Sequence, residues 1–79
     1  MTRSELVDLI DAGNDIMFDC DGKSFTILGW YEDGPIISEQ VTEDNERVFK
    51  DGAQLVDNYI INGKPLKDRL HQIDVTFHS

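Results

Sequence analysis

The chain has 79 residues, of which 39% are hydrophobic, and 16 Asp and Glu against seven Lys and Arg, so its formal net charge is −9. A chain of this length supports one modest core, and residues 1–79 are expected to form a single domain. The apolar content excludes a disordered acidic tail, and the shortage of bases argues against direct binding of nucleic acid or an anionic membrane.

The sequence shows no pattern for a metal, a cofactor or a membrane span. Cys20 is the only cysteine, which excludes an internal disulfide and a four-cysteine zinc site. His71 and His78 have no recognisable ligand spacing, and Asp21-Gly22 does not fit the register of a calcium loop. No apolar run approaches the ~20 residues that cross a bilayer, and no secretory leader pattern is present. We expect a cytoplasmic protein without a cofactor or a metal.

The first expected element is a short helix over residues 5–12. Leu6 and Ile10 lie on one face of this helix. Thr2 and Glu5 have the spacing of a capping box, which marks its start.

On either side of Asp21-Gly22, apolar residues then recur at every second position. This pattern predicts a β-hairpin with a two-residue type I′ turn. That turn pairs Phe18 with Phe25 and Ile16 with Ile27, so the large apolar side chains gather on one face.

A third antiparallel strand is expected over residues 36–41, with Pro35 at its start, and it completes a meander. The second face of this sheet is then partly apolar. It carries Met17, Leu28, Trp30 and Ile37. We expect either a helix or a binding partner to cover part of that face.

The second half of the chain reads as mainly helical. Residues 42–46 are expected to form a polar loop, and residues 47–49 are left open as a fourth strand or an anchor. Asp51 followed by Gln54 marks a helix start, and Asn62-Gly63 marks the end of that helix.

A further short helix is expected from Pro65, because Leu66, Leu70 and Ile73 follow at helical spacing. Val75-Phe77 is left open as a short terminal strand. The expected fold is therefore α+β, a three-stranded antiparallel meander with one N-terminal and two C-terminal helices in the order αβββαα.

The charge is unevenly distributed along the chain. Residues 1–46 contain 12 acids and two bases, whereas residues 47–79 contain four acids and five bases. Such a surface either keeps the protein soluble or attracts a basic partner. The candidate partner-binding residues are the acids Glu32, Asp33, Glu39, Glu43, Asp44 and Glu46 and the apolar residues Trp30, Tyr31 and Ile37, which we expect to be exposed.

Catalysis is not expected, and no catalytic residue is assigned. The sequence has neither a nucleophile elbow nor a phosphate-binding Gly-rich loop. Cys20 lies on the apolar face of the hairpin, where we expect a buried side chain and not a reactive thiolate.

The segments at residues 15–27 and 61–67 resemble those of small uncharacterised proteins from bacteria and their mobile elements. These proteins share a short first helix, a hairpin with a Gly-Lys turn and a late Gly-Lys-x-Leu helix start. In size and acidity the chain is also similar to phage-encoded inhibitors of host defence, including anti-CRISPR proteins. That similarity implies a small acidic inhibitor that blocks the nucleic-acid site of a nuclease, and it assigns no site residues.

The leading hypothesis is a non-enzymatic module that binds a basic protein surface, with a host defence nuclease as the sharpest candidate partner. An accessory or assembly protein that associates with itself through the Trp30 face is one alternative. A small hydrolase or enzyme subunit that uses Asp or Glu is another.

Overall fold

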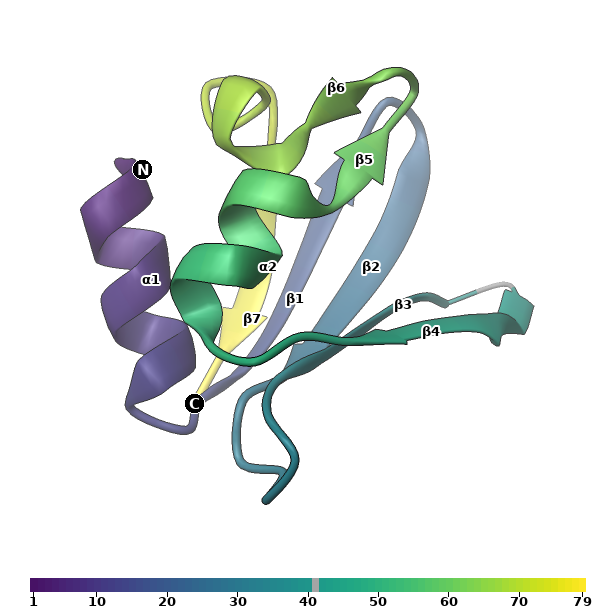
Figure 1. The fold of residues 1–79 in the computed structure, drawn as a ribbon. Helices are drawn as coiled ribbons and strands as arrows, with labels where there is room; N and C mark the ends of the chain where they lie inside the picture. The colour runs from purple at the N-terminus through teal and green to yellow at the C-terminus, as the bar shows by residue number, and fades with distance from the viewer. Residues whose placement is uncertain (41) are drawn as a thin grey trace.

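The structure is a computed structural model that describes residues 1–40 and 42–79, without the side chains of residues 42–45. Within this part the chain forms two α-helices, a 3₁₀ helix and seven strands (Figure 1). In chain order these are α1 (Arg3–Asp11), β1 (Asp15–Cys20), β2 (Lys23–Leu28), β3 (Ile36–Glu39), β4 (Thr42–Val48), α2 (Gly52–Asn58), β5 (Ile60–Ile61), β6 (Lys64–Pro65), η1 (Leu66–Asp68) and β7 (Asp74–His78).

Five strands form one antiparallel sheet in the order β4-β3-β2-β1-β7. The C-terminal strand β7 lies beside β1, so residues far apart in the sequence pair in the sheet. Both helices lie on the same face of this sheet, and β5 and β6 form a separate small hairpin (Figure 1). The fold therefore has a helical layer on one side and an uncovered sheet face on the other.

The expected first helix and hairpin are confirmed. Thr2 and Glu5 form the capping box at the start of α1. In the hairpin, Phe18 pairs with Phe25, and the turn residues Asp21 and Gly22 have φ of 52° and 78°. Both values are positive, as a type I′ turn requires.

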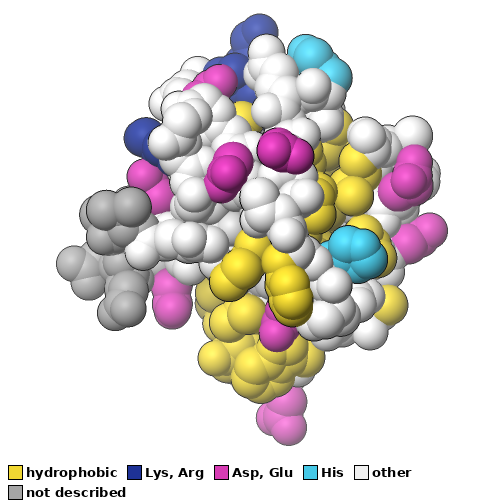
Figure 2. Space-filling view, turned by 180° about the vertical axis from the view of Figure 1, so that it is seen from behind, with side chains coloured by type: hydrophobic (Ala, Val, Ile, Leu, Met, Phe, Trp, Pro, Cys, Tyr) yellow, Lys and Arg dark blue, Asp and Glu magenta, His cyan; other side chains and the backbone are white. Residues whose placement is uncertain are grey.

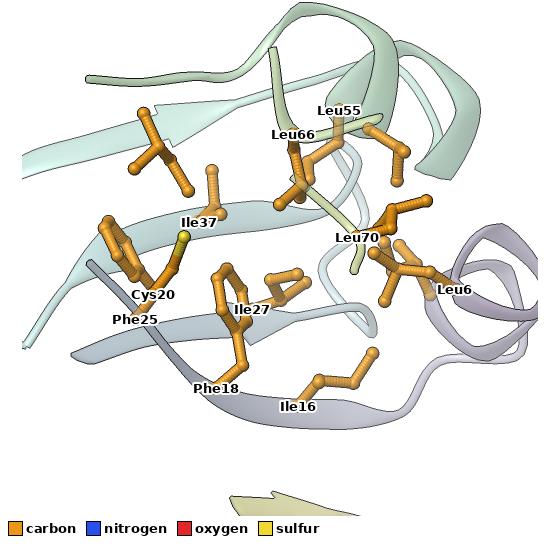
Figure 3. Packing of buried hydrophobic residues seen from close by; sticks show 13 residues of the cluster. Leu6, Ile16, Phe18, Cys20, Phe25, Ile27, Ile37, Leu55, Leu66 and Leu70 are labelled. Carbon is orange, nitrogen blue, oxygen red and sulfur yellow. The ribbon is translucent and has the colours of Figure 1, made fainter. Parts of the chain in front are cut away.

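The core lies between the sheet and the helices (Figure 3). Side chains from β1 and β2, among them Ile16, Phe18 and Ile27, point toward Leu55 of α2 and Leu66 of η1. The Phe18 and Phe25 rings stack with centroids 5.2 Å apart. Burial of these apolar side chains is the main favourable contribution to folding.

The expected three-stranded meander is wrong, because two further strands extend the sheet at its edges. Residues 42–46, expected to be a polar loop, belong to β4, which pairs with β3 and also includes Val48. The terminal strand left open at residues 75–77 is β7, and its partner is β1. Val41, expected in the third strand, lies outside the described residues.

The expected second C-terminal helix is also wrong. Only η1 is helical there, and successive turns continue the chain, with the Arg69 amide donating to the Leu66 carbonyl and the Gln72 amide to the Arg69 carbonyl, both at 2.8 Å. These turns bury Leu66 and Leu70 without an α-helix. The apolar spacing was informative about burial but not about helix type.

The second helix ends earlier than expected. Its start at Asp51 is confirmed, since the Asp51 carboxylate accepts the Gln54 amide at 2.9 Å. It ends at Asn58, and Asn62-Gly63 forms the turn between β5 and β6. Asn-Gly strongly favours the two-residue turn of a β-hairpin, and here it forms a hairpin turn and not a helix end.

Candidate functional site

The side of the five-stranded sheet that faces away from the helices carries exposed apolar side chains, and we call it the open sheet face. In β1, residues 16, 18 and 20 are buried under the helices, whereas Met17 points the other way and is 37% exposed. Met17 pairs with Phe77 of β7, which is 49% exposed. A second row on this face consists of Leu28, Ile36 and Val48, which pair across β2, β3 and β4.

Figure 2 shows hydrophobic side chains gathered on the open sheet face, with Asp and Glu side chains around them. They run from the middle of the face to the end where the connection between β2 and β3 lies (Figures 1 and 2). Contiguous apolar surface with a polar rim is typical of protein interaction sites. We therefore place the candidate site on this face.

The connection between β2 and β3 includes two exposed aromatic residues, one of them the most exposed aromatic side chain of the described chain. Trp30 is 59% exposed and Tyr31 is 41% exposed, and their rings stack with centroids 4.4 Å apart. Glu32 and Asp33 follow directly and are also exposed. We call residues 30–34 the aromatic loop.

Backbone contacts constrain the aromatic loop. The Gly34 amide donates to the Tyr31 carbonyl at 3.1 Å and closes a turn. Gly34 has φ of 116°, and a side chain there would collide with the Phe49 carbonyl oxygen. Beyond it, the Phe49 amide donates to the carbonyl of the buried Pro35 at 3.0 Å. The aromatic pair thus lies on a hydrogen-bonded turn, and such a constraint lowers the entropy cost of binding.

The structure brings four of the candidate residues together, namely Trp30, Tyr31, Glu32 and Asp33. The other candidates lie elsewhere. Glu46 is exposed on the edge strand β4, whereas Glu39 lies on the helix side with its carboxylate 3.9 Å from the Lys23 ammonium. The side chains of Glu43 and Asp44 lie outside the described residues.

The expectation that Ile37 is exposed is wrong. Ile37 pairs with Ile27 on the core side of the sheet, and its side chain is fully buried. The period of two placed Ile36 and Ile37 on opposite faces but did not show the register of β3 against β2, which pairs Ile37 with the core residue Ile27. Ile36 is the partly exposed member of this pair.

Sequence reasoning missed Phe77 as part of this surface. The alternation of Val75 and Phe77 was visible, but its meaning depended on the pairing of β7 with β1. Cys20 is 1% exposed, as expected, and burial raises the pKa of its thiol. A raised pKa disfavours the thiolate, so Cys20 serves packing.

The described side chains include no cluster of three or more His, Cys, Asp or Glu placed to hold a metal ion. Among the described helices, none is both long enough and apolar enough to cross a bilayer. No family model, curated protein or solved structure matches this chain.

Proposed function

We propose that this protein is a non-enzymatic binding module that contacts a basic protein partner through its open sheet face and its aromatic loop. The stacked, exposed pair of Trp30 and Tyr31 beside Glu32 and Asp33 carries this proposal. Trp and Tyr are the side chains most enriched at binding hot spots, because they offer large contact areas with few rotatable bonds. The adjacent carboxylates favour a partner with Lys and Arg around an apolar contact.

The net charge of −9 supports a basic partner. A negative surface attracts a positive one over distance and speeds their encounter. The sharpest form of the proposal is that the module occupies the nucleic-acid-binding surface of a host defence nuclease, as a phage or mobile-element inhibitor would. The similarity in size and acidity to such inhibitors favours this form, and competition by nucleic acid would test it.

Self-association through the same face is the alternative that the exposed apolar residues also favour. Sedimentation separates the two, since an apolar dimer persists at high salt whereas attraction to a basic partner weakens. A stable dimer at high salt that buries Trp30 would favour the assembly role.

The decisive experiment compares partner binding by the wild type and by a variant with Trp30→Ser and Tyr31→Ser. A host protein retained on the immobilised wild type is purified, and its dissociation constant is measured for each form. We expect the double variant to bind at least about tenfold more weakly, because truncating a hot-spot aromatic costs about 2 kcal/mol or more.

Ile60→Ser is the matched control, because Ile60 is 56% exposed but lies on β5, away from the open sheet face. It should leave the dissociation constant unchanged. Equal losses in the control and the double variant, or no loss in either, would contradict the proposed surface. Excess DNA or RNA should displace the protein if the partner's nucleic-acid site is the target, and lack of displacement would limit the proposal to a general basic surface.

A further inference from the structure

A pocket of about 320 Å³ lies on the helix side of the sheet, on the opposite side from the open sheet face. Residues of β2, β3 and β4 line one side of it, and residues at the end of α2 and in β5 line the other. This volume is at the lower end of the roughly 300–1,000 Å³ that is usual for small-molecule sites. The pocket is therefore suited to a small ligand and not to a protein.

Aromatic side chains supply the apolar part of the pocket. Tyr59 contacts Phe25 edge-to-face with centroids 6.1 Å apart and Phe49 in the same way at 6.4 Å. Phe25 is buried, and Phe49 and Tyr59 are half-buried, so part of their surface lines the pocket. Such walls bind a flat or compact apolar group.

The net charge of the residues that line the pocket differs in sign from the net charge of the whole chain. Among the described side chains, two bases, Lys23 and Arg47, and one acid, Glu39, line it, so these groups sum to +1 in a chain of net charge −9. Lys23 and Glu39 are 3.9 Å apart, a distance that leaves the ammonium able to bind another group. Glu39 and Arg47 line the same pocket as the Tyr59 phenol, and burial followed by Glu39 raises the pKa of Tyr59 while Arg47 opposes them.

The far wall of the pocket is held in place by a buried arginine. Arg69 donates to the carbonyls of Ile61 and Asn62 at 3.2 and 2.9 Å and forms an ion pair with Asp21 at 3.1 Å. The Asn62 amide also donates to Asp21 at 3.0 Å. These contacts fix β5 to the β1–β2 turn, so the pocket is formed before any ligand binds, as most small-molecule sites are.

We propose that this pocket binds a small monocarboxylate with an aromatic or compact apolar body. The carboxylate lies between Lys23 and Arg47, and the apolar body lies against Phe25, Phe49 and Tyr59. One negative charge matches the +1 balance of these groups, whereas a doubly charged phosphate would exceed it. This site is separate from the surface proposed for the partner.

Three probes of nearly equal shape test the assignment, namely indole-3-acetate, its neutral amide and the cationic tryptamine. Binding is followed by shifts of the backbone amide signals in NMR spectra of the full chain. We expect indole-3-acetate to bind with a dissociation constant of about 1 mM or tighter and to shift signals of the pocket residues. The amide should bind several-fold more weakly, and tryptamine more weakly still.

Arg47→Gln and Lys23→Gln should each weaken the carboxylate about fivefold or more, because each removes a charge-assisted hydrogen bond. Lys67→Gln is the matched control, since Lys67 is exposed in η1 and does not line the pocket. The proposal is overturned if the wild type does not bind the carboxylate, if the amide or tryptamine binds as tightly, or if the control loses as much affinity as the pocket variants.

Discussion

Phe18 and Phe25 are the residues around which the core of this domain is built. Their rings stack across β1 and β2, and Phe18 is fully buried. Each faces the helical layer, so the pair joins the hairpin to the rest of the fold (Figure 3). Loss of either ring leaves a cavity that the surrounding side chains fill only in part.

Phe18→Ala should lower the free energy of unfolding by about 3–5 kcal/mol, the usual cost of truncating a buried Phe. This is comparable to the whole stability of a small domain, about 5 kcal/mol or somewhat more. Urea denaturation measures the change. Phe77→Ala, at a ring that is 49% exposed, should cost much less. Equal losses at the two positions would contradict the assignment of the two sheet faces.

At the residue scale, the sequence predicted those residues of the candidate site that are neighbours in the chain. Trp30, Tyr31, Glu32 and Asp33 are consecutive, and a short turn exposes all four. Ile37 was misplaced because its exposure depends on the pairing register of β2 and β3. Alternation within a single strand does not contain that register.

At the element scale, strands specified by neighbouring residues were predicted from the sequence, and strands specified by distant partners were not. The β1–β2 hairpin is specified by its own alternation and by its Asp-Gly turn. Strand β7 is identified by its partner β1, at the opposite end of the chain. Strand β4 is polar in composition and lacks the apolar alternation of a strand, so it is recognised only by its pairing with β3. Edge strands with charged residues are common, because charge there discourages aggregation.

Helices α1 and α2 are joined by an ion pair with a definite pH dependence. Arg3 donates to both carboxylate oxygens of Asp57, at 2.7 and 2.8 Å. These hydrogen bonds hold the pKa of Asp57 below its usual value. A lowered folded-state pKa means that the pair stabilises the fold above about pH 4 and that this contribution is lost as the pH falls through the folded-state pKa.

We expect Asp57→Asn to be less stable than the wild type at neutral pH and to approach it in stability under acidic conditions. Urea denaturation of both proteins across this pH range measures the difference. Asp68→Asn, at an exposed acid of η1, is the control and should show no such convergence. A stability difference that stays constant with pH would contradict a role for the ionised pair.

At the scale of the whole molecule, the helical layer and the open sheet face divide the surface into two sides. The pocket with its two bases lies on the helix side, and the aromatic loop with its acids lies at the end of the open sheet face. Charges on exposed groups act over about 8 Å at physiological salt. An acid near the binding surface should therefore affect binding more than an acid elsewhere, even when the net charge is the same.

The variant with Glu32→Lys and Asp33→Lys should associate more slowly with the partner, and its association rate should depend less on salt. Each reversal adds two charges, so the net charge changes from −9 to −5. Asp8→Lys with Asp68→Lys makes the same change at exposed positions of α1 and η1. Stopped-flow kinetics compares the two variants. Equal slowing would show that only the total charge matters.

Trp30 is the only tryptophan of the chain, so fluorotryptophan incorporation places a single NMR reporter in the aromatic loop. Its fluorine signal, recorded as the partner is added, tests directly whether this loop is the binding surface. We expect the signal to shift and broaden in proportion to the fraction bound, as water leaves the indole. An unchanged fluorine signal at saturating partner, with amide signals of α1 shifted instead, would contradict binding through the aromatic loop.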